Sequence, residues 1–254
     1  MIHWALEAGG RPPDVESLTL AERARLGELR LPKRRADWLL GRVTVKAVAA
    51  RALAEVLPGE WPAAALEIVK ERGGRPWVRL APEAAPMGGL APGERLPIDV
   101  SISHAEGHAL CAATGAGPGG EGASRAIGID LVGIEARSDA LVDTFFTDDE
   151  QRLVRDAAPP DRATCANLVW CAKEAVLKVL GVGLTADTRD LSCLPEPGEA
   201  DPTDWPLAPA ADGWRPFAAT CTPALVPGGG TIRGVWRSFP GFVAALAATR
   251  RASP

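Results

Sequence analysis

Residues 170–178 place two lysines and a glutamate in the segment Trp-Cys-Ala-Lys-Glu-Ala-Val-Leu-Lys. The apolar residues between them have helical spacing, which predicts one helix through the segment. Glu174 and Lys178 are four residues apart, so this helix places them on one face, one above the other. Lys173 and Lys178 are two of only five lysines in the chain. The segment suits binding of a metal or an anion, and a solvated Glu–Lys pair on a helix surface is the alternative.

A buried carboxylate is predicted at Asp130. It lies in the apolar run 126–132, Ala-Ile-Gly-Ile-Asp-Leu-Val, which is typical of a β-strand. Burying an ionised carboxylate is costly unless its charge is compensated. A hard cation such as Mg²⁺ compensates it, because Mg²⁺ binds carboxylate oxygens, water and substrate phosphates. Two interpretations stay open here: a metal ligand, or a carboxylate that caps a strand or pairs with an arginine.

A third polar element ends the alternating run 100–104, Val-Ser-Ile-Ser-His. The alternation predicts a strand whose end carries Ser103 and His104. A hydroxyl and an imidazole at an exposed strand end suit a phosphate group. A structural histidine is the alternative interpretation.

Taken in chain order, these three elements resemble the motifs of the 4′-phosphopantetheinyl transferase superfamily, specifically of its Sfp-type branch. That branch carries a Ser-His motif, then Gly-Ile-Asp, then a Trp-x-x-Lys-Glu-x-x-x-Lys helix. The resemblance extends to Gly-Arg-Pro at 74–76 and Leu-Leu-Gly-Arg at 39–42. It therefore spans about residues 30–185, and the apolar segment 241–245 is similar to the last strand of the family.

The resemblance implies an α+β fold of two similar α/β halves, related by a pseudo-twofold axis, with the active site in the cleft between them. We expect residues 1–118 to form the first half and residues 119–254 the second, with the boundary in the Gly-rich segment 115–124. Periodicity alone predicts helices and strands, in one or two domains. The predicted helices are 18–29, 34–57, about 148–157 and 163–180. Further predicted strands are 66–69, 77–80, 109–114, 215–221, 231–237 and 241–249.

The same resemblance implies a reaction. The 4′-phosphopantetheine arm of coenzyme A is transferred to a serine of an apo acyl or peptidyl carrier protein, and adenosine 3′,5′-bisphosphate is released. The metal is Mg²⁺, with Mn²⁺ as an alternative because both prefer oxygen ligands. Asp130 and Glu174 are the implied metal ligands, and with Lys178 they form the catalytic group, in which Glu174 accepts the serine proton. The implied coenzyme A contacts are Arg34, Arg42, Arg75, Pro76, Ser103, His104, Lys173 and Lys178.

One position departs from the family pattern. Many members have a second carboxylate two residues after the Asp, where this chain has Val132. We therefore expect Asp130 and Glu174 as the protein ligands, with water completing the metal site. Glu135 follows Asp130 by an odd offset of five, which places it on the opposite face of the strand. Two alternatives stay open: a decayed homologue that binds coenzyme A or a carrier without turnover, and a metal-dependent phosphohydrolase.

Composition excludes other classes. A net charge of −4 argues against a general nucleic-acid-binding protein. The chain has no apolar run long enough for a membrane span and no secretory pattern at Met1–Trp4, so we expect a cytoplasmic protein without a membrane partner. Five cysteines without a Cys-x-x-Cys pair predict free, mostly buried thiols.

The resemblance implies that the two halves of one chain form the cleft, so we expect a monomer. Fatty-acid, polyketide and nonribosomal-peptide carriers are all compatible acceptors.

Overall fold

The structure, a computed structural model, describes residues 1–10, 14–115, 125–209 and 212–250. These residues form two compact units. The first lies within 1–127 and 206–210, and the second within 128–205 and 211–249. The division falls inside strand β6 (Arg125–Gly133). The boundary predicted between residues 118 and 119 lies outside the described residues.

A four-stranded sheet in the order β4-β5-β1-β8 forms the centre of the first unit. Its strands are β1 (Ile2–Ala8), β4 (Ile98–Ala105), β5 (His108–Gly115) and β8 (Leu207–Ala208). Strands β1 and β4 are antiparallel to β5, whereas β8 is parallel to β1. In β4 the apolar residues Ile98, Val100 and Ile102 alternate with polar ones, so one face of the sheet is apolar and has to be covered.

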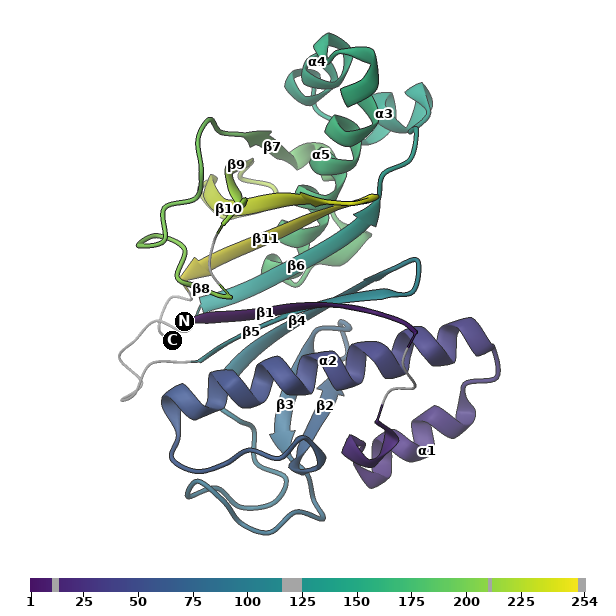
Figure 1. Cartoon of the computed structure of the whole chain (residues 1–254). Helices are drawn as coiled ribbons and strands as arrows, with labels where there is room; N and C mark the ends of the chain where they lie inside the picture. Colours follow the sequence, from purple (N-terminus) through teal and green to yellow (C-terminus); the bar gives the residue numbers. More distant parts are fainter. Residues whose placement is uncertain (11–13, 116–124, 210–211, 251–254) are drawn as a thin grey trace. The chain divides into compact units, whose positions relative to one another are not determined.

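Helix α2 (Pro32–Val56) covers that face of the sheet (Figure 1). Proline at its start is favourable, because the first helical position has no hydrogen bond for its N–H to make. Helix α1 (Leu20–Glu28) precedes it and begins with a capping box between Thr19 and Glu22. The hairpin β2 (Leu66–Lys70) and β3 (Pro76–Leu80) packs on the same core. That core is built from Val45, Val48, Ala49, Leu53, Ile68, Val78, Val100 and Cys111.

A five-stranded sheet in the order β6-β11-β10-β9-β7 forms the second unit. Besides β6, its strands are β7 (Leu191–Pro195), β9 (Arg215–Cys221), β10 (Gly230–Phe239) and β11 (Phe242–Arg250). Helix α5 (Pro159–Leu180) packs on this sheet, and α3 (Asp139–Phe145) and α4 (Asp148–Asp156) lie beside it (Figure 1). Short 3-10 turns occur in the two units at Val15–Ser17, Ala63–Ala65, Gly183–Thr185 and Thr188–Asp190.

The structure confirms the α+β class and the four predicted helices, whose ends differ from the prediction by a few residues. Sequence reasoning missed β1, α3, β7 and β8. Strand β1 was missed because its seven residues become a strand only by pairing with β5, about a hundred residues later in the chain. The pseudo-twofold relation between the halves stays a prediction.

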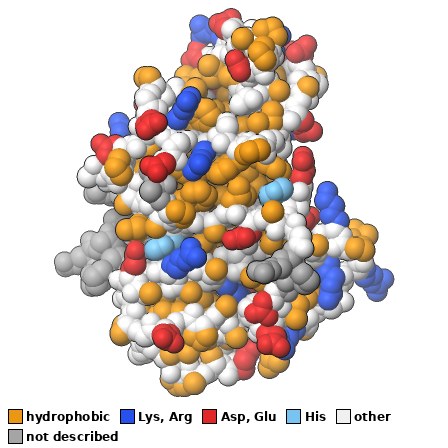
Figure 2. All heavy atoms as spheres, viewed as in Figure 1, with side chains coloured by type: hydrophobic (Ala, Val, Ile, Leu, Met, Phe, Trp, Pro, Cys, Tyr) orange, Lys and Arg blue, Asp and Glu red, His pale blue; other side chains and the backbone are white. Residues whose placement is uncertain are grey.

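The surface carries charges of both signs. On the face drawn in Figure 2, acidic and basic side chains are interspersed, as a net charge of −4 leads one to expect. No helix in the described ranges combines the length and the apolar character that crossing a membrane requires. The five cysteines are free thiols, four of them buried and Cys165 half-buried, which confirms the prediction.

Candidate functional site

Helix α5 presents Glu174 and Lys178 together, as the four-residue spacing predicts. Ala175, Val176 and Leu177 are fully buried, whereas Glu174 and Lys178 are half-buried. The helix is therefore anchored through its apolar residues, and its two charged residues share a face that solvent partly reaches.

Asp130 on β6 meets this face of α5. The Lys178 ammonium donates hydrogen bonds to Asp130 Oδ1 at 2.7 Å and to the Ile129 carbonyl at 2.8 Å. Asp130 is only 6% exposed, as predicted for a carboxylate inside an apolar strand. Its charge is compensated by a lysine rather than by the arginine considered from the sequence. The structure thus brings Asp130, Glu174 and Lys178 together in the second unit.

Gly128 allows this meeting. A Cβ atom at this position would lie 2.0 Å from the Ala175 carbonyl oxygen and 2.9 Å from the Val179 backbone nitrogen. Both are backbone atoms of α5, so the clash could be relieved only by moving the helix away from the strand. The glycine of the Gly-Ile-Asp motif is therefore a requirement of close strand–helix packing two residues before Asp130.

We expect Gly128→Ala to destabilise the protein by about 3 kcal/mol or more, since overpacking a tight contact typically costs about 1–3 kcal/mol and backbone gives less than side chains. Urea denaturation measures this. Gly27→Ala in α1 is the matched control, because a Cβ there meets nothing within 4 Å and alanine favours the helix. Equal stability of Gly128→Ala and the wild type would contradict the close approach of β6 to α5.

The Glu174 carboxyl is held close to that of Asp130. Burial raises the pKa of Glu174 above its ordinary value, Asp130 raises it further, and Lys178 opposes both. Among the described residues, Glu174 forms no hydrogen bond or ion pair with another side chain. A carboxyl whose charge is disfavoured by burial and by a neighbouring carboxylate lies where a bound cation would be stabilising.

The raised pKa predicts a pH-dependent stability. A raised folded-state pKa contributes stability that is present below the ordinary pKa of glutamate and is lost as pH rises through the folded value. Glutamine mimics the protonated form, so metal-free Glu174→Gln should be more stable than the wild type near neutral pH. The two proteins should be equally stable below about pH 3, where the glutamate is protonated in both the folded and the unfolded state. Urea midpoints in EDTA measure this, with exposed Glu199→Gln as the control, and a wild type that is more stable at neutral pH would contradict it.

Neither position 132 nor Glu135 adds a third carboxylate to Asp130 and Glu174. Val132 lies on the same face of β6 as Asp130 and is half-buried. Glu135 follows the end of β6, is 65% exposed and pairs with Arg137. Within the described ranges, no group of three His, Cys, Asp or Glu side chains is arranged to hold a metal ion.

Lys173 lies in a different environment from Lys178. It is 0% exposed, and its ammonium forms an ion pair with Glu150 at 2.8 Å, which is also 0% exposed. The same ammonium donates to the Thr188 carbonyl at 2.6 Å and to that of Leu191. A phosphate contact needs an accessible ammonium, so this geometry corrects the sequence-based assignment of Lys173 to coenzyme A. Lys173 directly precedes Glu174 in the chain, so the helix turns its side chain away from the face that carries Glu174 and Lys178.

The first unit contains a basic cavity of about 360 Å³ between α1, α2 and β2. Arg34 and Arg42, both predicted from the sequence, line this cavity together. Its other charged lining residues are Glu22, Arg25, Glu67 and Lys70. The cavity thus has four cations and two carboxylates, and both carboxylates are already paired, Glu22 with Lys46 and Glu67 with Arg79.

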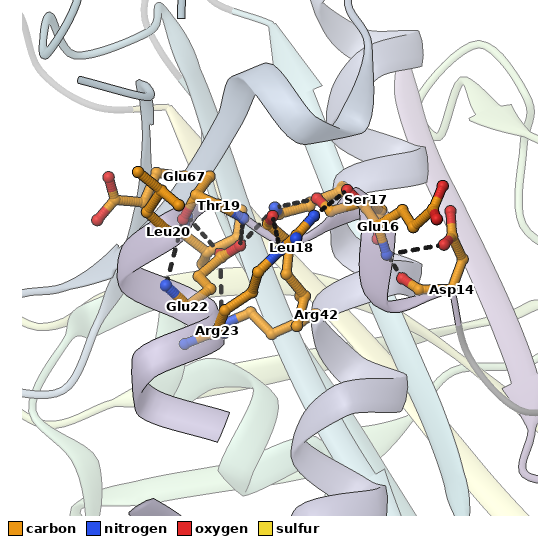
Figure 3. A network of polar contacts seen from close by, with 12 residues as sticks. Asp14, Glu16, Ser17, Leu18, Thr19, Leu20, Glu22, Arg23, Arg42 and Glu67 are labelled. Carbon is orange, nitrogen blue, oxygen red and sulfur yellow. Dashed lines mark hydrogen bonds and ion pairs between the residues drawn. The ribbon is translucent and has the colours of Figure 1, made fainter. Parts of the chain in front are cut away.

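Arg42 forms the inner part of this cavity. It is 7% exposed, and its guanidinium lies 4.8 Å from the centre of the Trp38 ring. Its Nε is 3.7 Å from Glu22 and makes no hydrogen bond (Figure 3). Glu22 is held instead by Lys46 and by the amides of Thr19 and Ile68. Burial lowers the pKa of Arg42, and Glu22 opposes the shift. A buried cation with an unused donor suits an anion.

The pKa of Lys70 reflects the positive charge of the same cavity. Loss of surrounding water lowers the pKa of its ammonium, and repulsion from Arg42, Arg25 and Arg34 lowers it further. Arg25, Trp38 and Lys70 were not assigned to the site from the sequence. Only the basic composition around residues 23–35 pointed to Arg25, and nothing local connects Lys70 with α2, since they meet through the tertiary fold.

The remaining predicted residues lie elsewhere in the first unit. The half-buried Arg75 forms an ion pair with buried Asp99 at 2.7 Å, and Asp99 also accepts the Ile127 amide. Pro76 begins β3, and Ser103 is buried on β4. Pro76 and Ser103 are thus parts of strands, and Arg75 is held next to Pro76 by its ion pair.

His104 is exposed at the end of β4 and lies against α2. A Cβ at Gly41 would be 2.0 Å from His104 Nε2, so only glycine leaves space for the imidazole. The structure thus places His104 beside the residue that precedes Arg42, and connects the Ser-His and Leu-Leu-Gly-Arg segments. Gly41 is a positioning residue that sequence reasoning did not single out.

Comparison with known proteins finds similarity to a family model and to solved structures. Residues 126–212 match the family model described as ACPS, 4′-phosphopantetheinyl transferase superfamily, and this segment contains Asp130, Glu174 and Lys178. The crystal structure of Thermotoga maritima holo-[acyl-carrier-protein] synthase (AcpS) is similar to 50% of this chain, with 16% identity and a TM-score of 0.33. That similarity covers 64% of the synthase chain, which is less than two thirds of it. None of the curated proteins compared with the chain matches it.

Proposed function

We propose that this chain, whose residues 126–212 belong to the 4′-phosphopantetheinyl transferase superfamily, transfers the 4′-phosphopantetheine arm of coenzyme A to a serine of an apo acyl or peptidyl carrier protein. Adenosine 3′,5′-bisphosphate is the second product. The observation that carries the proposal is the grouping of Asp130, Glu174 and Lys178 inside the matched segment. The Sfp-type branch, a monomeric state and a cytoplasmic location belong to the same proposal.

Asp130 and Glu174 fit a divalent cation. Mg²⁺ is usually bound by one or two carboxylates, with water and substrate phosphate as the other ligands. The two carboxyls supply that number, and a cation would favour the ionised form of Glu174, whose pKa is raised by burial and then by the neighbouring Asp130. When bound, Mg²⁺ or Mn²⁺ supplies charge neutralisation at the pyrophosphate oxygens.

Lys178 and Glu174 perform the steps that fall to side chains. The carrier serine Oγ forms a bond to the phosphorus next to pantetheine, and the bond from that phosphorus to the bridging pyrophosphate oxygen breaks. Lys178, anchored on Asp130 and the Ile129 carbonyl, places its ammonium where phosphate charge develops. Glu174, half-buried on the same face of α5, accepts the serine proton.

The basic cavity of the first unit is proposed to bind anionic groups of coenzyme A. Four cations line it, and the Nε donor of Arg42 has no hydrogen-bond partner. Arginine forks bind phosphate bidentately, which supports Arg34 and Arg42 as contacts and adds Arg25 and Lys70. Arg75, Pro76, Ser103 and His104 stay proposed contacts from the motif resemblance, and Lys173 is left out because it is buried with Glu150.

Intact mass spectrometry of an apo carrier protein tests the proposal. With this chain, coenzyme A and Mg²⁺, the carrier should gain the mass of one phosphopantetheine, and a chelator should abolish the gain. A carrier whose acceptor serine is replaced by alanine is the control. Acyl and peptidyl carriers are both tested, because the acceptor class is part of the proposal.

Two outcomes would contradict the transferase. Cleavage of coenzyme A with an unmodified carrier would indicate a metal-dependent phosphohydrolase. Bound coenzyme A without any modified carrier would indicate a decayed homologue, the alternative that Val132 favours.

A further inference from the structure

Glu22 of α1 contacts two cations of α2. Arg42 and Lys46 are four residues apart, so the helix places them on one face, one above the other. Both form ion pairs with the Glu22 carboxylate. Lys46 is 0% exposed, Glu22 is 4% exposed and Arg42 is 7% exposed. Two positive charges and one negative charge are therefore buried together in the first unit.

The two cations do not share Glu22 equally. The Lys46 ammonium forms a close ion pair with Glu22 Oε2 and donates a hydrogen bond to the Ser17 carbonyl at 2.7 Å. Two backbone amides also donate to the Glu22 carboxylate, at 3.1 Å each. Arg42 Nε stays 3.7 Å from Oε1 and makes no hydrogen bond to the described residues (Figure 3). Glu22 is thus bonded to Lys46 and only near to Arg42.

The less compensated cation is the one that lines the basic cavity. Arg42 belongs to the lining, whereas Lys46 does not. The other carboxylate of the lining, Glu67, accepts two hydrogen bonds from Arg79, at 3.0 and 3.1 Å. A buried cation without a bonded counter-charge is costly, and an anion that enters the cavity would give Arg42 an acceptor.

We propose that Lys46 is a positioning residue, which holds Glu22 away from Arg42 and so keeps the Arg42 guanidinium available to a phosphate group of the ligand. This inference rests on the proposed function, because it takes the basic cavity as a binding site for anionic groups of coenzyme A. Lys46 acts through Glu22, since a side chain that is 0% exposed does not reach the ligand. Without its ammonium, Glu22 would pair with Arg42 and compete with the phosphate.

Isothermal titration calorimetry with adenosine 3′,5′-bisphosphate in EDTA tests the inference without metal or carrier. Lys46→Met should weaken binding by about 10-fold, the loss expected when one charge-assisted hydrogen bond to the anion is given up. Adding Glu22→Gln to Lys46→Met should restore the affinity, because a neutral amide does not compensate Arg42. Glutamine also suits the capping box with Thr19. Lys33→Met is the matched control, since it removes the same charge from an exposed position of α2, and it should change the affinity little.

Arg42→Met separates this inference from the proposed function. Unchanged binding by Arg42→Met would remove the basic cavity from the proposed coenzyme A site, and transfer to the carrier would still be tested by mass spectrometry. Weaker binding by Arg42→Met together with unchanged binding by Lys46→Met would overturn only the role of Lys46. A double variant that binds no better than Lys46→Met would also overturn it, because the loss would then come from altered packing.

Lys46→Gln replaces Lys46→Met if the latter does not fold. Its amide can still donate to the Ser17 carbonyl but carries no charge, so the same loss of affinity and the same recovery with Glu22→Gln are expected.

Discussion

Asp130→Ala is expected to lower kcat/KM for transfer of phosphopantetheine by about 10³-fold. A metal ion contributes several kcal/mol of charge stabilisation to such a transition state, and each 1.4 kcal/mol corresponds to about a factor of ten. Asp130 also anchors Lys178, whose ammonium would no longer be held at 2.7 Å. Both effects act on the transition state, so kcat should fall more than KM rises.

The fold should survive this substitution. Lys178 is 29% exposed, so water can rehydrate its ammonium when the carboxylate is removed. Asp130→Asn is the control, because it keeps the size of the side chain and removes only its charge. Steady-state assays over a range of Mg²⁺ concentrations, with urea denaturation of each variant, measure the effect. Near-wild-type turnover of Asp130→Ala would remove Asp130 from the proposed site.

The two lysines of the motif should behave in opposite ways. Lys173→Met is expected to destabilise the protein by about 3–5 kcal/mol, because it leaves Glu150 as an unpaired charge in the interior. Lys178→Met should cost less stability than Lys173→Met, because its own side chain is 29% exposed, although the buried Asp130 carboxylate loses this ion pair. It should instead lower kcat by about 10²-fold or more, as loss of one donor to developing charge typically does.

The double variant Lys173→Met with Glu150→Gln is the control for the first effect. Glutamine keeps one oxygen, which can accept the Cys193 amide, and carries no charge, so part of the lost stability should return. Urea denaturation and single-turnover assays separate the two lysines. A stable but inactive Lys173→Met protein would reverse the assignment and return Lys173 to the site.

The local sequence pattern was sufficient to predict part of this site. The spacing of Glu174 and Lys178 predicted their shared helix face, and the apolar run around Asp130 predicted its burial. Both follow from periodicity, because a helix or a strand fixes the direction of each side chain relative to its near neighbours. The order of the three motifs pointed to the superfamily whose model matches residues 126–212.

Contacts between distant residues could not be predicted in this way. Glu150 lies more than twenty residues before Lys173, and no local pattern separates a lysine that meets a buried carboxylate from one that meets a phosphate. The same holds for Lys70, which joins Arg25, Arg34 and Arg42 only because β2 lies against the helices. Gly128 and Gly41 were seen as parts of motifs, but their clashes with Ala175 and His104 depend on how the elements pack.

The sequence by itself thus determined most of the helices and strands, the similarity to the superfamily model and the three groups Asp130, Glu174 and Lys178, since these depend on residue type and on spacing within one element. The tertiary structure decided which cations stay accessible: it buried Lys173 against Glu150 and left Lys178 partly exposed on Asp130. The physical reason is that the cost of burying a charge depends on its partners, and those partners come from elsewhere in the chain.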